Sequence, residues 1–225
     1  MKRVLTLILV MGLALTLSLG LAACNNSEEE YDQLSGEETA QQEAPAPVEM
    51  PADEPADLWE GDMPKVKIEI QDFGDVVVEL NREAAPQTVD NFLRLVEEGF
   101  YDGVGFHRII EGFMIQGGDP DGTGMGGSGE HIEGEFASNG IPNPIRHSRG
   151  VISMARAGDP NSASSQFFIV HQDSNFLDGE YAAFGRVVEG MDVVDAIAEN
   201  TPAEAGSGAV EPANHPTMTR VSVID

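Results

Sequence analysis

The sequence predicts a mainly β fold, a closed eight-stranded antiparallel β-barrel capped by two α-helices. Short apolar runs recur along the chain between clusters of Gly, Pro, Asn and Asp, which is typical of strands joined by turns. Only two segments space their apolar residues as helices do, too few for a fold in which helices alternate with parallel strands. Because closing an antiparallel sheet removes its exposed edges, we expect a barrel.

A β-hairpin opens the predicted domain. Val66, Ile68 and Ile70 alternate with charged residues, so one face of this segment is apolar. The turn-forming residues 72–75 then precede a second apolar run at 76–80. Two such runs separated by a short turn predict paired antiparallel strands.

Two amphipathic helices are predicted. The first begins at Pro86, carries apolar residues at helical spacing, and ends before Gly99, a residue type suited to a helix C-terminus. The second is indicated by the same spacing over residues 191–198. The remaining short apolar runs are predicted to be strands at 105–110, 113–116, 151–155, 166–170, 181–188 and 217–224.

The first 24 residues are typical of an export signal. Two basic residues precede an uncharged apolar run at 4–23, which ends in Leu-Ala-Ala-Cys24. Small residues before the chain's single cysteine resemble the bacterial lipobox, in which the cysteine is lipidated after cleavage. We therefore expect 1–23 to be a lipoprotein signal peptide and the protein to be extracytoplasmic, anchored to the cell membrane by lipid on Cys24. The apolar run is also long enough to span a bilayer, so a retained membrane helix is the alternative.

Residues 24–63 are predicted to be an acidic, Pro/Glu-rich disordered tether, and 64–225 the folded domain. Between residues 25 and 63 the chain has 13 acidic residues and no basic one. Such a composition cannot bury a core. The net charge of the whole chain, −27, excludes a surface that neutralises nucleic-acid phosphates, so no nucleic-acid partner is expected.

Other chemical signals in the sequence are weak. Residues 122–127 match a GxGxxG spacing, but no helix pattern follows and nearby carboxylates would repel a pyrophosphate, so we interpret the stretch as a glycine-rich surface loop that turns sharply. The five histidines have no metal-ligand spacing, and we interpret them as surface or hydrogen-bonded residues. No GxSxG motif marks a nucleophilic serine, and Cys24 belongs to the export segment. We therefore expect neither a metal nor another cofactor.

The segment 106–119 concentrates apolar and amide side chains around Arg108. In a strand, Phe106, Arg108 and Ile110 would share one face. Taken alone, these residues fit a barrel core in which Arg108 is a surface charge whose stem lies on the sheet.

The same segment resembles the central motif of the cyclophilins. The likeness continues in the same order at 153–156 (SMAR), 164–169 (SSQFFI), 176–179 (FLDG) and 184–191 (FGRVVEGM), and it covers about 65–225. Several long motifs with matching separations are far more specific than one glycine pattern. The resemblance implies an eight-stranded barrel with two helices and peptidyl-prolyl cis-trans isomerase (rotamase) activity.

Site residues follow from this resemblance position by position. Arg108 matches the family's catalytic arginine, and Gln116 matches the glutamine near the substrate carbonyl. The implied substrate-binding residues, which hold the proline ring or line the adjoining groove, are Phe113, Met114, Ala155, Arg156, Gln166, Phe168, Phe176, Leu177 and Tyr181. At three of these positions many eukaryotic members have a different residue. They have a tryptophan where this chain has Phe176, a histidine where it has Tyr181 and an asparagine where it has Arg156. The departures resemble bacterial members and bear on cyclosporin binding more than on activity.

The resulting hypothesis is an isomerase that assists the folding of exported proteins. Its expected partners are proline-containing polypeptides and, through Cys24, the membrane, and we expect a monomer. A cyclophilin-like proline-peptide binding or chaperone module with little turnover is the alternative, since a fold does not guarantee catalysis. An acidic structural lipoprotein of the envelope is a third hypothesis.

Overall fold

The computed structural model describes residues 46–61 and 63–224. They belong to one compact unit. The predicted signal peptide and Cys24 lie outside the described residues. Within the described ranges, no helix is long and apolar enough to cross a membrane.

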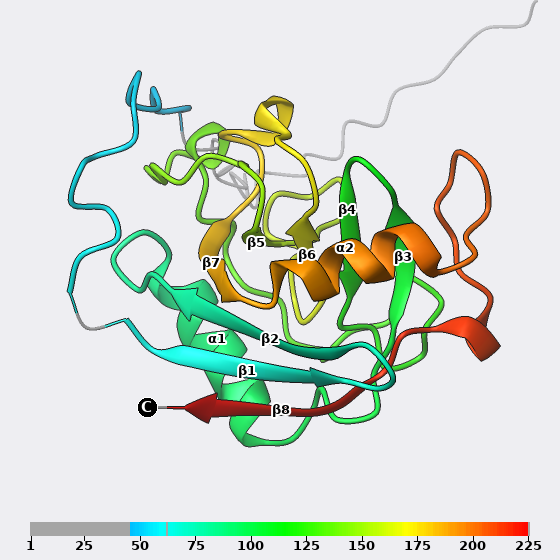
Figure 1. Ribbon diagram of the computed structural model, residues 1–225. Helices are drawn as coiled ribbons and strands as arrows, with labels where there is room; N and C mark the ends of the chain where they lie inside the picture. Colours follow the sequence, from blue (N-terminus) through cyan, green and yellow to red (C-terminus); the bar gives the residue numbers. More distant parts are fainter. Residues whose placement is uncertain (1–45, 62, 225) are drawn as a thin grey trace, which may run out of the picture. The chain divides into compact units, whose positions relative to one another are not determined.

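Eight strands form one antiparallel sheet in the order β3-β4-β6-β5-β7-β2-β1-β8 (Figure 1). The mainly β fold with eight antiparallel strands and two helices is therefore confirmed. The strands are β1 (Lys65–Ile70), β2 (Gly74–Leu80), β3 (Phe106–Ile110), β4 (Met114–Gly117), β5 (Val151–Met154), β6 (Phe167–Val170), β7 (Ala183–Glu189) and β8 (Met218–Ile224).

The predicted full closure of the barrel is overstated. β3 and β8, at the two ends of the sheet, are joined by an isolated bridge between Gly105 and Thr217 rather than by a paired ladder. The Phe106 N–H also donates to the Pro216 carbonyl (2.9 Å). The chain before β8 contains a short 3-10 turn, Pro212–Asn214, and then Pro216. Because prolines lack an N–H group, this stretch cannot extend the ladder along β3.

The two helices lie against the sheet as the sequence predicted. α1 (Pro86–Glu97) packs against β8, and α2 (Met191–Asn200) packs against β2, β3 and β4. Gly99 follows α1 with φ of +69°, a left-handed conformation that glycine adopts at little cost. Both helix positions thus agree with the spacing of apolar residues.

A carboxylate from far along the sequence accepts the free N–H groups at the N-terminus of α1. The Glu135 side chain is 2% exposed and accepts the backbone N–H groups of Gln87 (3.0 Å) and Thr88 (2.8 Å). It also accepts the Thr88 hydroxyl (2.7 Å). These donors have no partner within the helix, and the positive end of the helix dipole favours an anion there.

Aromatic side chains fill the barrel. Phe92 from α1 meets Phe167 edge to face, with ring centroids 5.5 Å apart, and also contacts Phe184 and Tyr101. Side chains on a strand alternate between its two faces, so the next residue of β6, Phe168, points the other way. It belongs to a second, smaller apolar cluster with Met114 and Leu177 on the outer face of the sheet. Because the interior of the barrel is filled by side chains, a binding site is expected on the outer face of the sheet.

Residues 46–61, here called the flanking segment, form a loop beside the domain that precedes β1 (blue to cyan in Figure 1) and contact it through individual side chains. The Asn81 side-chain amide donates to the Leu58 carbonyl (2.6 Å), and the Arg186 guanidinium lies 4.3 Å from the Trp59 ring centroid. The folded unit therefore begins before the domain boundary that the acidic composition predicted.

Replacing Glu135 by alanine removes the acceptor at the start of α1. We expect the free energy of unfolding, measured with urea, to fall by about 3 kcal/mol, because buried donors left without partners cost about 1–3 kcal/mol each. Glu133→Ala is the matched control, since Glu133 accepts an exposed side-chain amide of Gln87 (3.0 Å). The control should change stability by less than about 0.5 kcal/mol, and equal losses in the two variants would contradict the role of Glu135.

Candidate active site

An apolar pocket of about 280 Å³ opens on the outer face of the sheet. It contains nine of the eleven residues that the resemblance implied for the site. They come from β3, the turn after it, β4, β6 and the loops after β5 and β6, and they are Arg108, Phe113, Met114, Gln116, Ala155, Arg156, Phe168, Leu177 and Tyr181. The strand order brings together segments that are about 70 residues apart in the sequence.

The pocket has an apolar floor and a rim of aromatic groups. Met114, Phe168 and Leu177 are buried, at 1%, 5% and 7% exposure. Tyr181 packs edge to face on Phe168 with ring centroids 5.9 Å apart. Phe176 does not line the pocket; it is 73% exposed and contacts Phe113 at a centroid distance of 5.5 Å. The residue at the tryptophan position thus supports the rim from outside.

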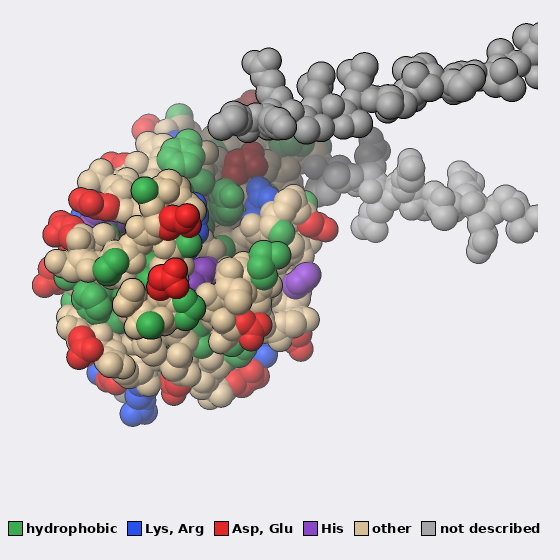
Figure 2. All heavy atoms as spheres, turned by 90° about the vertical axis from the view of Figure 1, so that its right-hand side faces the viewer, with side chains coloured by type: hydrophobic (Ala, Val, Ile, Leu, Met, Phe, Trp, Pro, Cys, Tyr) green, Lys and Arg blue, Asp and Glu red, His purple; other side chains and the backbone are tan. Residues whose placement is uncertain are grey.

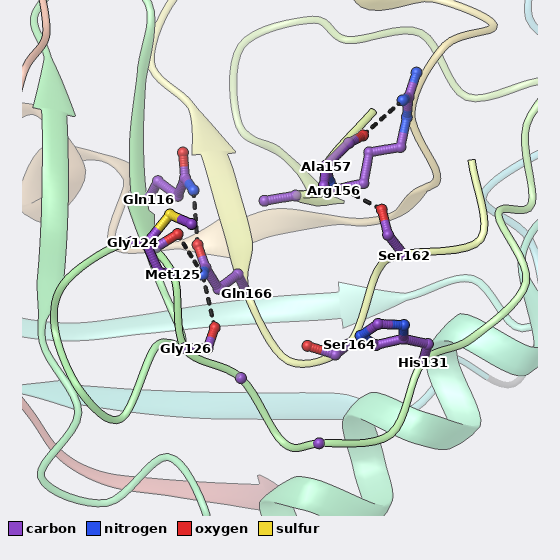
Figure 3. Close-up of a pocket in the computed structure, with 13 residues that line it drawn as sticks. Gln116, Gly124, Met125, Gly126, His131, Arg156, Ala157, Ser162, Ser164 and Gln166 are labelled. Atoms are coloured by element: carbon purple, nitrogen blue, oxygen red, sulfur yellow. Dashed lines mark hydrogen bonds between the residues drawn. The ribbon is translucent and has the colours of Figure 1, made fainter. Parts of the chain in front are cut away.

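A second pocket of about 510 Å³ adjoins the first and shares Gln116, Ala155 and Arg156 with it (Figure 3). Gln166, which the first pocket lacks, lies here. The remaining lining residues are Gly124, Met125, Gly126, Gly127, Gly129, His131, Ala157, Ser162 and Ser164. Sequence reasoning interpreted the glycine-rich stretch only as a surface loop. Its turn-forming composition predicted a loop, but nothing local to it indicated a groove wall.

A chain of hydrogen bonds orders the polar side of the site. Arg108 Nη1 donates to Gln116 Oε1 (3.3 Å), and Gln116 Nε2 donates to Gln166 Oε1 (2.9 Å). Gln166 Nε2 then donates to the carbonyls of Gly124 (3.0 Å) and Gly126 (2.8 Å), as Figure 3 shows. Each amide therefore has an acceptor side and a donor side that are fixed by its neighbours.

The Arg108 guanidinium is held from two directions. Besides Gln116, its Nε donates to the Ser207 carbonyl (2.9 Å). The register of β3 shifts between Phe106 and Arg108, a bulge that changes the direction of the following side chain. The result is a half-buried cation held in a fixed position at the edge of an apolar pocket.

Asp119 determines the shape of the glycine-rich loop. It is 1% exposed and accepts the backbone N–H groups of Asp121 (2.8 Å), Thr123 (2.9 Å) and Gly124 (2.6 Å). Burial by itself would raise the pKa of Asp119, but these backbone donors and that of Gly126 bring the pKa below its ordinary value of 3.8. A side chain at Gly126 would collide with this carboxylate, so the loop requires glycine there.

His107 departs from what the sequence suggested. It is 6% exposed, and among the described residues neither ring nitrogen has a hydrogen-bond partner. Burial lowers the pKa of His107 below its ordinary value, which Asp119 opposes only in part. A neutral imidazole beside Arg108 adds no second charge to the site.

The charges at the site differ from those of the surface around it. The two pockets are lined by Arg108, Arg156 and His131 and by no carboxylate. Acidic side chains are spread over the face drawn in Figure 2, with few Lys or Arg between them. The Arg156 guanidinium lies between the rings of Phe136 (5.0 Å) and Tyr181 (4.8 Å). No group of three or more residues that could hold a metal occurs within 46–61 and 63–224.

Comparison with known proteins identifies the same fold and the same stretch of chain. The family model of the cyclophilin type peptidyl-prolyl cis-trans isomerase/CLD matches residues 65–223. Peptidyl-prolyl cis-trans isomerase ppi1 of Schizosaccharomyces pombe is 48% identical over 128 residues, 56% of this chain and 81% of that protein. Peptidyl-prolyl cis-trans isomerase B of Bacillus subtilis is 47% identical over 123 residues, 55% of this chain and 82% of that protein.

Solved structures agree with these relatives. The crystal structure of a cyclophilin type peptidyl-prolyl cis-trans isomerase of Cryptosporidium parvum matches with a TM-score of 0.64 at 32% identity, over 73% of this chain and 99% of that one. The structure of the same protein in the presence of the dipeptide Ala-Pro matches with a TM-score of 0.63, over 72% of this chain and 99% of that one. Because the family model spans most of the described domain, the chain belongs to the cyclophilin-type peptidyl-prolyl cis-trans isomerase family.

Proposed function

We propose that the chain catalyses rotation about X–Pro peptide bonds in exported polypeptides, outside the cytoplasm and held at the membrane by lipid on Cys24. The observation that carries the catalytic part is the fixed Arg108 guanidinium beside an apolar pocket that fits a proline ring. The related structure described with Ala-Pro supports a proline-containing ligand.

The reaction needs no bond to break. A planar amide resists rotation with a barrier of about 18–20 kcal/mol because twisting removes its resonance. A catalyst has only to bind the twisted amide more tightly than either planar isomer. Twisting frees the lone pair of the prolyl nitrogen, so a donor aimed at that nitrogen gains a partner only in the transition state. Arg108 is that donor, since its fork of N–H groups is permanently charged.

The apolar floor anchors the ring while the preceding residue rotates. Proline has no backbone N–H, so burying it against Met114, Phe168 and Leu177 leaves no donor without a partner. Gln116 lies next to Arg108 and can bind the carbonyl of the rotating residue. Its amide is already oriented by Gln166, which limits the ordering needed when substrate binds.

The floor itself is supported from below by His147. Its buried ring stacks on Phe168 (centroids 6.0 Å apart) and bridges Ser153 Oγ and Asp178 Oδ1, both at 3.0 Å. This Ser-His-Asp set has the geometry of a hydrolase triad, but Ser153 is 0% exposed, so no substrate can reach its hydroxyl. Burial alone would raise the pKa of Asp178, yet the bonds from His147 hold the pKa below 3.8. The set stabilises the loop that carries Leu177.

The location is proposed from the N-terminal sequence. An uncharged apolar run that ends in Leu-Ala-Ala-Cys24 supports export and lipidation, and the acidic residues that follow would separate the domain from an anionic membrane surface. An enzyme placed there would meet newly exported chains whose X–Pro bonds isomerise in tens to hundreds of seconds without catalysis.

Substitution of Arg108 tests the catalytic role. In an assay of X–Pro isomerisation, Arg108→Ala should lower kcat/KM by about tenfold or more, because one donor to the transition state is lost. The kcat/KM of Arg108→Lys should lie between those of the wild type and Arg108→Ala, since an ammonium group keeps the charge but lacks the fork of N–H donors. Arg220→Ala, an exposed arginine of β8, is the control and should match the wild type. Equal rates for Arg108→Ala and the wild type would refute the role, and an inactive wild type that binds proline peptides would favour the binding module.

Acid should weaken the support of the pocket floor. A pKa below 3.8 in the folded chain means that folding favours ionised Asp178, so this stabilisation is present above 3.8 and is lost as the pH falls through the lower, folded-state pKa. Asp178→Asn should lower the urea midpoint at about pH 7, and its difference from the wild type should shrink toward about pH 3. A difference that does not change with pH would contradict the assignment.

Mass spectrometry of the protein from the membrane fraction tests the anchor. The mature N-terminus should be Cys24 with the added mass of one or more acyl chains, and Cys24→Ala should prevent this modification. A mature chain that keeps residues 1–23 would instead establish a membrane helix.

A further inference from the structure

The flanking segment lies beside the loop that forms one wall of the proline pocket. That loop, residues 175–181, carries the pocket residues Leu177 and Tyr181. The Val48 N–H of the segment donates to the Ala137 carbonyl (2.9 Å), and the Ser138 N–H donates to the Gly179 carbonyl of the loop (2.8 Å). Met50 fills the space beside Gly179, where a methyl group would lie 3.3 Å from its sulfur. The segment therefore touches the pocket wall directly.

Arg146 connects the flanking segment to the same loop. Its Nη2 donates to the carbonyls of Pro51 (2.7 Å) and Ala52 (2.6 Å), and its backbone N–H donates to Glu54 Oε1 (2.8 Å). Its Nη1 pairs with Asp178 Oδ2 (3.4 Å), next to Leu177 in the chain. One guanidinium thus holds both the segment and the wall.

A third link runs through the apolar cluster that contains the pocket floor. Leu58 is 9% exposed and belongs to the apolar cluster that contains Met114, Phe168 and Leu177. Trp59 packs against this cluster from outside. Most other residues of the segment face solvent, so the shielded positions are those that meet the domain.

These contacts lie outside the part of the chain that matches the family, which begins at residue 65. We propose that the flanking segment is a positioning element of the isomerase site, which fixes the pocket wall through Arg146, Met50 and Leu58. The proposal rests on the isomerase function proposed above. The segment acts through Leu177 and Tyr181, whereas Arg108 and Gln116 are held by the sheet.

The proposal predicts an effect on binding rather than on chemistry. In the full chain, Leu58→Ala should raise KM for a tetrapeptide containing Ala-Pro about fivefold, which corresponds to about 1 kcal/mol, and leave kcat within about twofold. Arg146→Lys should act in the same direction, because lysine keeps a cation beside Asp178 but has no fork to bridge two carbonyls. Asp57→Asn, at an exposed position of the same segment, is the matched control and should leave KM unchanged.

The chain's single tryptophan provides a readout that stability alone would not move. Trp59 lies in the segment, and the site has phenylalanine at 176, so the emission reports on the segment. Titration with the same peptide should change the wild-type emission with a saturation midpoint near KM, and Arg146→Lys should reduce that change.

Two results would overturn the proposal while the isomerase function stands. One is an active wild type in which Leu58→Ala and Arg146→Lys leave KM unchanged. The other is a loss of kcat in both variants at constant KM, which would place the segment in the chemistry of the reaction. A wild type without isomerase activity would refute the proposed function itself.

Discussion

The cross-strand register of the sheet is the constraint on which the site depends. Across four neighbouring strands it places Arg108 opposite Gln116, Gln116 opposite Phe168, and Phe168 opposite Ser153. The residue before Phe168, Phe167, belongs to the packed interior because side chains alternate between the faces. A slip of one residue would bury the polar groups and expose the aromatic core. Core packing and catalysis therefore require the same register.

The sheet sets the backbone positions of the polar residues of the site, and loops set the orientations of their side chains. Asp119 fixes the glycine-rich loop, the loop carbonyls fix the amide of Gln166, and that amide fixes Gln116. A glutamine side chain in water has no preferred orientation. Here hydrogen-bond donors on one side of each amide and acceptors on the other allow only one orientation. The ordering cost is met during folding, so the groups around Arg108 need little rearrangement when the amide twists.

Local sequence patterns were sufficient for the hairpin and both helices, because each depends on the spacing of apolar residues in a short window. The open end of the barrel was missed because Pro216 matters only when β8 lies beside β3. The docking of the flanking segment was missed because Leu58 and Trp59 are two apolar residues in an acidic stretch, too few for a periodic pattern. The support of Phe168 by His147 requires Asp178, 31 residues away, so no local motif could show it. The residues of the pocket came from the family resemblance, and the structure gathers nine of them around one cavity.

The pocket is thus built from two parts with different mechanical support. Two of its floor residues, Met114 and Phe168, and its cation, Arg108, stand on paired strands, whose positions are determined by backbone hydrogen bonds and by the packed interior. The third floor residue, Leu177, and the wall residue Tyr181 stand on a loop, whose position depends on side-chain contacts from Asp178, Arg146 and the chain that precedes the barrel. Loops tolerate change more readily than packed strands. A chain with this division can alter which proline segments it binds by altering the loop and its supports, while Arg108, the donor proposed to distinguish the twisted amide from the planar one, stays in place.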